Sequence, residues 1–222
     1  MTVVIAVDGT AASGKGTLAK RLARHFNFAH MDSGALYRLT ALAVLDNKSD
    51  PANEADALNG ARAIDLTRIA DPAIRSDVVG RYASQVAAIP AVRAVLHDFQ
   101  TSFLASPPGQ SLGAVMDGRD IGTVIAPDAT AKLFVDATPE IRAHRRWLEL
   151  KSLGIVKDEA ELLAELAARD ARDGSRAVSP MKKAADAFLL DTTELDIDAA
   201  FAAALALVSP KIEDALKDRP RG

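Results

Sequence analysis

The chain contains no cysteine among its 222 residues, which excludes a disulfide framework, a thiolate metal site and a catalytic thiol. Aromatic residues make up only 5% of it and offer no stacking platform for single-stranded nucleic acid. The net charge of −3 indicates no polyanionic partner. The longest apolar run, 199–208, is far shorter than the roughly 20 residues that a membrane span needs. We therefore expect a soluble, cytoplasmic monomer without a nucleic-acid or membrane partner.

Histidines are also few and scattered along the chain. The four of them, His25, His30, His97 and His144, share no segment and no metal-ligand spacing. We therefore expect no metal site made by protein side chains, so a metal ion would have to arrive with a substrate.

The apolar pattern predicts a single α/β domain over residues 1–222. Residues 2–7 are short, apolar and rich in β-branched side chains, as in a parallel strand covered on both faces. After a glycine loop, Leu18, Leu22 and Phe26 recur every four residues, which predicts a helix with one buried face. We expect further strands at 28–31, 112–116, 132–135 and 187–190, and helices at 33–45, 79–88, 91–103, 139–151, 159–172 and 197–208. Five strands alternating with helices predict a parallel sheet.

A glycine-rich string between the first strand and the first helix is the strongest functional signal. Two glycines lie four residues apart and a lysine follows the second, the spacing of a phosphate-binding loop. The amides of such a loop and the positive end of the helix dipole converge on a phosphate, and Lys15 adds a mobile charge. A tight turn without a ligand is the alternative, which the flanking strand and helix argue against. The predicted ATP-binding residues of this loop are Gly9, Thr10, Ala11, Ala12, Ser13, Gly14, Lys15, Gly16 and Thr17, the last with a hydroxyl near magnesium.

Three other polar groups are candidates for binding a second substrate. The segments 32–38 and 117–120 each follow an expected strand, at the sheet edge where open α/β folds bind ligands. A helix cap by Ser33 is an alternative for the first segment, and a structural salt bridge for the second. The third group, Arg169, Arg172 and Arg176 with Asp173, falls on one helical arc. Seen alone, it favours an exposed helix face with ion pairs to nearby carboxylates.

The motifs in this order resemble those of bacterial cytidylate kinases, from residue 3 to about residue 208. The resemblance is carried by Gly-Thr-Ala-Ala-Ser-Gly-Lys-Gly-Thr at 9–17, Asp-Ser-Gly-Ala-Leu-Tyr-Arg at 32–38, Ala-Ser-Gln-Val-Ala-Ala at 83–88, Asp-Gly-Arg-Asp-Ile-Gly-Thr at 117–123 and Arg-Asp-Ala-Arg-Asp-Gly-Ser-Arg-Ala at 169–177. It implies a P-loop three-layer fold with an acceptor-side insert at about 46–83 and a short lid at about 151–177. The insert lacks strand alternation, so we expect the family's small antiparallel sheet to be reduced here.

The resemblance also implies roles for individual residues. Arg145 approaches ATP, and magnesium is carried with the nucleotide. The residues that hold CMP or dCMP are Ser33, Tyr37, Arg38, Ser84, Arg93, Arg119, Asp120, Arg169, Asp173 and Arg176. Lys15, Arg119, Arg169 and Arg172 form the predicted catalytic set, because they place positive charge around the transferring phosphate.

The chemistry of cytosine agrees with this assignment. Its N4 amino group needs an acceptor such as Asp120, and its N3 and O2 atoms need donors such as Arg93 and Ser84. Two alternatives stay open: another P-loop kinase of the adenylate or shikimate type, and a nucleotide-binding module that has lost transfer chemistry. The predicted function is transfer of the ATP γ-phosphate to CMP or dCMP.

Overall fold

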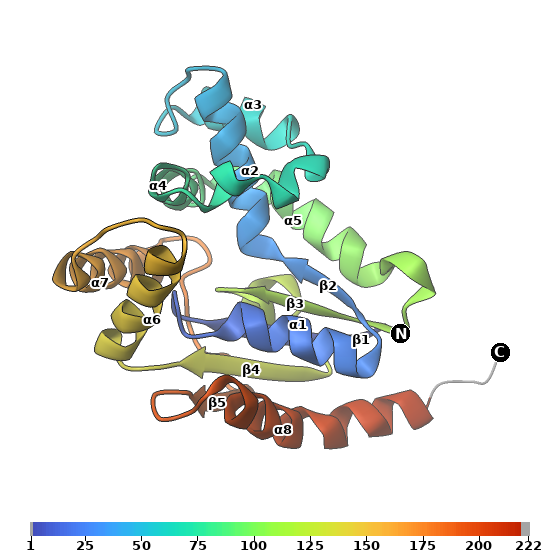
Figure 1. Cartoon of the computed structure of the whole chain (residues 1–222). Helices are drawn as coiled ribbons and strands as arrows, with labels where there is room; N and C mark the ends of the chain where they lie inside the picture. The colour runs from blue at the N-terminus through green and yellow to red at the C-terminus, as the bar shows by residue number, and fades with distance from the viewer. Residues whose placement is uncertain (1, 219–222) are drawn as a thin grey trace. The chain divides into compact units, whose positions relative to one another are not determined.

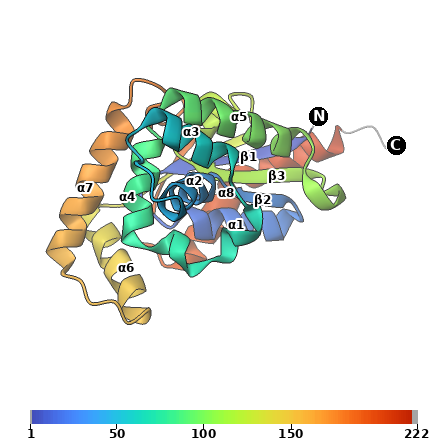
Figure 2. The same cartoon turned by 90° about the horizontal axis from the view of Figure 1, so that it is seen from above.

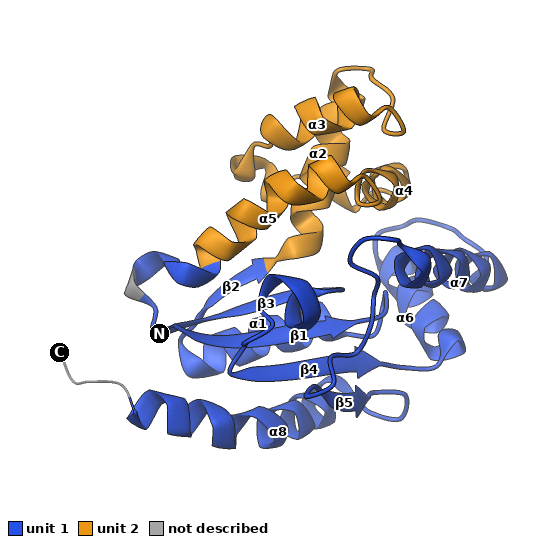
Figure 3. Cartoon of the chain, turned by 180° about the vertical axis from the view of Figure 1, so that it is seen from behind, with its two compact units in different colours: residues 1–31, 104–222 blue, residues 32–103 orange. Residues whose placement is uncertain are grey.

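A computed structural model describes residues 2–218 of the chain. The chain divides into two compact units, shown in Figure 3. Unit 1 contains the residues up to Met31 and those from Leu104 onward, and unit 2 is Asp32–Phe103.

A five-stranded sheet forms the centre of unit 1. Its strands are β1 (Val3–Gly9), β2 (Ala29–Asp32), β3 (Gly113–Gly118), β4 (Ala131–Asp136) and β5 (Phe188–Asp191), in the order β2-β3-β1-β4-β5. The central strand β1 pairs in parallel with β3 and β4, and β4 pairs in parallel with β5. Every residue of β1 is buried, as its run of β-branched side chains predicts. The predicted α/β class and all five strands are confirmed.

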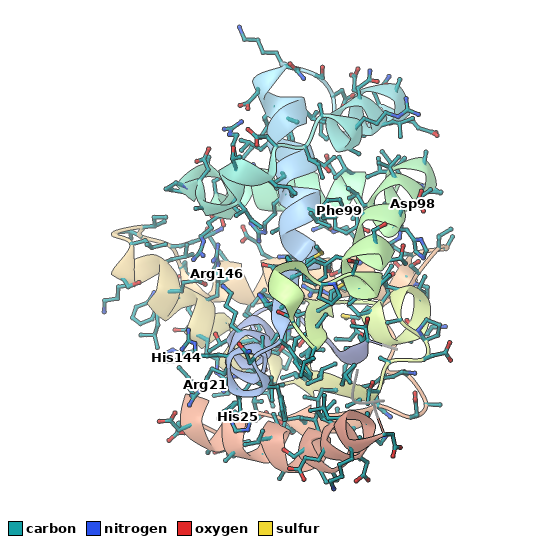
Figure 4. All side chains as sticks on the ribbon, turned by 90° about the vertical axis from the view of Figure 1, so that its right-hand side faces the viewer. Arg21, His25, Asp98, Phe99, His144 and Arg146 are labelled. Atoms are coloured by element: carbon teal, nitrogen blue, oxygen red, sulfur yellow. The ribbon has the colours of Figure 1, made fainter. Side chains whose placement is uncertain are left out.

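Two helices pack against this sheet side by side, α1 (Lys15–Phe26) and α8 (Ile197–Lys217) (Figure 1). Leu18 and Leu22 of α1 share one apolar core with Val208 and Ile212 of α8. On the surface beside that core, Arg21 and His25 extend toward α8 (Figure 4), where both contact the ring of Phe201. The first predicted helix is therefore confirmed.

Helix α8 extends nine residues beyond the predicted end at 208. Asp196 caps its first turn as expected, because its carboxylate accepts from the amides of Asp198 and Ala199. Pro210 lies inside the helix and removes one amide donor. The helix continues past it because Ile212 falls four residues after Val208 and is fully buried on the same face.

Helices α6 (Pro139–Ser152) and α7 (Glu159–Ser175) lie next to each other, as Figure 2 shows. Leu150 of α6 and Leu162 and Leu166 of α7 form a small buried cluster with Ala11 of the glycine loop. The pair of helices is thus packed directly on the loop. Helix α7 runs three residues beyond the predicted end at 172, through Gly174, and Arg176 lies just past it.

Unit 2 is helical. It contains α2 (Ser33–Asp46), α3 (Glu54–Arg62), α4 (Asp77–Val86), most of α5 (Pro90–Ala105) and two 3₁₀ turns, η1 (Leu66–Ala70) and η2 (Pro72–Arg75). Residues 46–83 contain no strand, in agreement with the missing alternation. Asp32, not Ser33, caps α2, because its carboxylate accepts from the amide of Ala35 and Ser33 is already the first helical residue.

Candidate active site

The glycine loop follows β1 directly and ends at the first turn of α1. Gly9 has φ +148°, and a Cβ atom there would lie 1.9 Å from the carbonyl oxygen of Val135, so only glycine fits. Gly14 has φ +87° and precedes α1, whose first turn has neither a side-chain cap nor an acidic residue. The amides at this helix start are therefore left for an external anion.

Three carbonyls of the loop, in contrast, have protein partners. The Thr10 carbonyl accepts from Ser13 Oγ at 3.0 Å and from Lys15 Nζ at 3.2 Å. The Ala11 carbonyl accepts from Arg142 Nη1 of α6 at 3.2 Å. The Ser13 carbonyl accepts from Thr192 Oγ1, which follows β5, at 3.1 Å. These bonds occupy three carbonyls of the loop and hold it in place.

Asp117, near the end of β3, faces the start of α1. Its Oδ1 atom lies 2.9 Å from Nε2 of His30, and its Oδ2 atom would lie 3.5 Å from a Cβ on Gly16. Glycine at position 16 therefore leaves open the space between this carboxylate and the loop. An oxygen ligand beside a phosphate cradle suits magnesium, so these residues fit a nucleotide-borne Mg²⁺ ion. No group of three or more metal-ligating side chains occurs within residues 2–218.

Three of the predicted arginines gather around one carboxylate in unit 1. Asp173 of α7 accepts from Arg119 Nε at 3.0 Å and from Arg176 Nη2 at 2.6 Å. Burial raises the pKa of Asp173, but the charges of Arg119, Arg176 and Arg169 outweigh burial and lower it overall. Asp173, which the family resemblance assigns to the acceptor, thus holds the arginines in place.

Two other predicted residues lie apart from this group. Arg172 is exposed on α7, and its Nε donates to the carbonyl of Ala168 at 3.3 Å. Arg145 donates to Thr192 Oγ1 at 3.0 Å and to the carbonyl oxygens of Thr192 and Leu195. Arg145 therefore reaches the glycine loop through Thr192, whereas Arg172 does not share the carboxylate that Arg119 and Arg176 bind.

Of the remaining acceptor residues, Asp120 is buried in unit 1, directly after Arg119, and the others lie in unit 2. Arg38 of α2 donates to the carbonyl of Ile74 at 2.7 Å. The Arg93 guanidinium of α5 lies 5.5 Å from the ring centroid of Tyr37 and donates to the carbonyl of Ala87 at 3.4 Å. The hydroxyl of Ser84 is buried and makes no hydrogen bond within the described residues. A buried hydroxyl in this state is suited to a ligand atom.

The sequence did not single out several residues that hold the site together. Asp8 binds the turn after Asp120, Asp136 accepts from Thr10 Oγ1 at 2.7 Å, and Thr192 binds the loop carbonyl. Asp8 had a signal, since it is the one charged residue in an apolar strand that leads into the glycine loop. Thr192 had none, because a threonine after a strand is common.

The sheet, the loop with its lysine and the clustered arginines define a P-loop kinase. The sequence profile of cytidylate kinase matches residues 5–209. The chain therefore belongs to the cytidylate kinase family, which confirms the resemblance drawn from its motifs. No helix among the described residues has the length and apolar character to cross a membrane.

Curated relatives match over nearly their whole length. A cytidylate kinase of Rhodopseudomonas palustris (strain TIE-1) is 53% identical over 206 residues, 93% of this chain and 95% of the relative. One of Afipia carboxidovorans is 52% identical over 93% of this chain and 97% of the relative. A solved structure, an uncharacterized protein from Eubacterium ventriosum ATCC 27560, has a TM-score of 0.51 at 16% identity and covers 94% of this chain and 99% of that one. This last likeness concerns the fold alone.

Proposed function

We propose that the chain transfers the γ-phosphate of ATP to CMP or dCMP, giving ADP and CDP or dCDP. The observation that carries this proposal is an anion cradle on a sheet with Lys15 beside it, in a chain that matches the cytidylate kinase profile over residues 5–209. A single kinase domain, with residues 46–83 on the acceptor side and 151–177 as the lid, belongs to the same proposal. So does action as a monomer in the reducing cytoplasm, with which a cysteine-free chain is compatible.

The reaction needs no general base from the protein. A phosphate monoester has a second pKa of about 6, so the acceptor phosphate is mostly a dianion at neutral pH. One of its oxygens attacks the γ-phosphorus of ATP in line, while the bond from that phosphorus to the β–γ bridging oxygen breaks and ADP leaves. The protein's part is alignment and neutralisation of charge.

Lys15 follows the γ-phosphate, and Arg119, Arg169 and Arg172 neutralise the reacting phosphates in this proposal. Mg²⁺ bound to ATP would lie near Asp117 and the Thr17 hydroxyl, and it would offset negative charge on the phosphate oxygens. The α6–α7 hairpin then excludes water, which limits hydrolysis of ATP.

The pyrimidine is assigned to a separate set of polar groups. Asp120 accepts from the N4 amino group, and Ser84 and Arg93 donate to N3 and O2. The buried Ser84 hydroxyl, which has no partner within the described residues, supports this assignment. Uracil carries a donor at N3 and an acceptor at C4, so the same groups reject UMP by leaving buried polar atoms unpaired.

The test is a coupled ADP-release assay with ATP, magnesium and one acceptor at a time: CMP, dCMP, UMP, AMP, GMP or shikimate. We expect turnover with CMP and dCMP only, and a loss of about 1000-fold or more in Lys15→Ala. Lys20→Ala, an exposed lysine on the same helix, is the matched control and should turn over normally. Asp120→Ala should lose the preference for cytosine. Turnover confined to another acceptor would overturn the assignment of Asp120, Ser84 and Arg93.

A binding module without transfer chemistry is separated by a second measurement. CMP alone should raise the midpoint of thermal unfolding of the kinase, because ligands that bind only the folded state stabilise it. A module that binds only ATP would show no shift with CMP and no ADP release with any acceptor.

A further inference from the structure

Asp8 is a buried carboxylate between two parts of the site that are distant in sequence. It is the second-last residue of β1, is 4% exposed, and directly precedes Gly9 of the phosphate loop. Its Oδ1 accepts from the amide of Ile121 at 2.8 Å, and its Oδ2 from the amide of Gly122 at 2.7 Å. One side chain thus ties the start of the phosphate loop to the chain that follows Asp120.

The two amides belong to a single helical turn, η4 (Ile121–Ile125), and need an outside acceptor. The first amides of a helical turn have no partner inside it. Asp120 stands at the cap position, but its side chain makes no capping bond there. Asp8 fills that role from a neighbouring strand, and it accepts with both oxygens where an ordinary cap uses one.

Packing around Gly122 leaves the carboxylate little freedom. A Cβ atom at this position would lie 3.1 Å from Cδ of Lys132 and 3.4 Å from Oδ2 of Asp8. A larger residue there would press on the Lys132 side chain, so glycine favours this close approach of the turn to the carboxylate. The position of the turn, and of Arg119 and Asp120 before it, is therefore set by where Asp8 stands on β1.

We propose that Asp8 is a positioning residue for the acceptor nucleotide, which keeps Arg119 and Asp120 in register with the phosphate loop. The inference rests on the proposed function, in which those two residues bind CMP. Asp8 itself touches no substrate in this proposal. Its effect passes through the backbone of η4 on one side and through Gly9 on the other.

The charges around Asp8 indicate that its two hydrogen bonds to η4 depend on pH. Burial raises its pKa to about 6, the two amides oppose that rise, Asp120 adds to it and Arg119 opposes it. Lys132, on β4, approaches the same turn with its aliphatic chain and places its ammonium group on Asp186. A protonated Asp8 would turn an O–H toward a donor, so we expect these two hydrogen bonds to weaken in mild acid, although protonation also removes the cost of burying the charge.

The test compares steady-state constants of the full chain at pH 7.5, after turnover of CMP by the unmodified enzyme has been established. Asp8→Asn keeps the shape of the side chain but turns an NH₂ group toward one of the two amides. We expect its KM for CMP to rise about tenfold or more and its KM for ATP to stay within about twofold, because other bonds hold the phosphate loop. Hydrogen exchange of residues 121 and 122 should become faster.

Two matched variants separate positioning from general damage. Asp136→Asn removes a carboxylate that binds Thr10 Oγ1 on the phosphate loop and should change KM for ATP more than KM for CMP. Lys132→Met removes a buried ammonium group close to Gly122, which pairs with the exposed Asp186, and should lower stability without changing the ratio of the two KM values.

The proposal is overturned if Asp8→Asn leaves KM for CMP unchanged. It is also overturned if Asp8→Asn raises KM for CMP and KM for ATP by the same factor, because a loss of packing alone would leave their ratio unchanged. Should Asp8→Asn fail to fold, Gly122→Ala disturbs the same contact from the other side and must give the same selective rise in KM for CMP. Absence of CMP turnover in the unmodified enzyme would instead refute the proposed function.

Discussion

The phosphate loop and the arginine group around Asp173 bind anions by opposite means. The loop presents backbone amides, and its carbonyls are held by partners from α6 and from the segment after β5. The arginine group presents side chains, and a single carboxylate pairs with both Arg119 and Arg176. A backbone cradle binds through amides that do not depend on side-chain charge, whereas the arginine group depends on one carboxylate. We therefore expect the loop to lose activity when a substitution changes its backbone shape, and the arginine group when a substitution removes the charge of Asp173.

The largest effect is expected from Gly9→Ala. The added Cβ would lie 1.9 Å from the Val135 carbonyl oxygen, a backbone atom that cannot move without disturbing β4. We expect ATP turnover to be lost and the free energy of unfolding to fall by more than about 4 kcal/mol, in the range reserved for severe core disruption. Gly109→Ala is the control: its φ is +69° but its Cβ would meet nothing within 4 Å, so only about 1–2 kcal/mol of backbone strain is expected. Urea titration with an activity assay measures both, and equal losses would contradict the steric argument.

Asp8 and Asp173 should show opposite dependence of stability on pH. The pKa of Asp8 is raised from 3.8 to about 6, so its folded form binds a proton more readily than its unfolded form. That contribution to stability is complete below pH 4 and is lost as pH rises through about 6, by about 3 kcal/mol in total. The unfolding free energy of Asp8→Asn minus that of the unmodified chain should therefore increase by about this amount from about pH 3 to about pH 7.

For Asp173 the pKa is lowered, so its contribution is present above the ordinary value of 3.8 and is lost as pH falls below it. The corresponding difference for Asp173→Asn should thus have the reverse slope and appear in more acidic solution. Chemical denaturation of both variants at a series of pH values checks the pair. The same slope in both would mean that the arginines do not compensate for the burial of Asp173.

Asp173→Asn also tests how the arginines work in catalysis. The substitution should lower kcat/KM by roughly 10- to 100-fold, because Arg119 and Arg176 lose the negative charge that orients them. If Asp173 acts through the arginines, kcat/KM should fall by the same factor with CMP and with dCMP. Asp170→Asn, three residues earlier on α7, removes the partner of Arg142 and should leave KM for CMP unchanged. A loss with CMP alone would indicate that Asp173 binds the 2′-hydroxyl.

The fold was predictable because its signals are local. The β-branched run of β1, the apolar run of β3 and the four-residue repeat of α1 depend only on neighbouring residues. The end of α8 was predicted too early, since the benefit of burying Ile212 beyond Pro210 depends on the core it meets. The alternative cap at Ser33 lies one residue too late, because Ser and Asp both accept from helix amides and only backbone geometry distinguishes them.

The site was predictable as far as its chemistry is carried by motifs. The glycine loop and the arginines at 119, 169 and 176 were named from the sequence, and those arginines act on one carboxylate in the structure. The helical arc did not distinguish Arg172, which is exposed, from Arg169, because periodicity gives a face without its neighbours. The links made by Asp8, Arg142 and Thr192 join segments more than 100 residues apart, and no local pattern records such pairs.

Thr192 provides the smallest and most selective test of the backbone cradle. Its hydroxyl accepts from Arg145 and faces the carbonyls of Ser13 and Asp136, each at 3.1 Å, so Thr192→Val removes a donor from the loop without changing side-chain volume much. A lost neutral hydrogen bond costs about 1 kcal/mol, which corresponds to about a fivefold rise in KM for ATP. Thr192→Ser should behave as the unmodified chain, and so should Thr193→Val, whose hydroxyl donates to Asp191 and accepts from the Thr138 amide but does not bond to the loop. If Thr192→Val raises KM for CMP as much as KM for ATP, the hydroxyl supports the whole strand end and not the loop, and the cradle is held by Arg142 alone among these side chains.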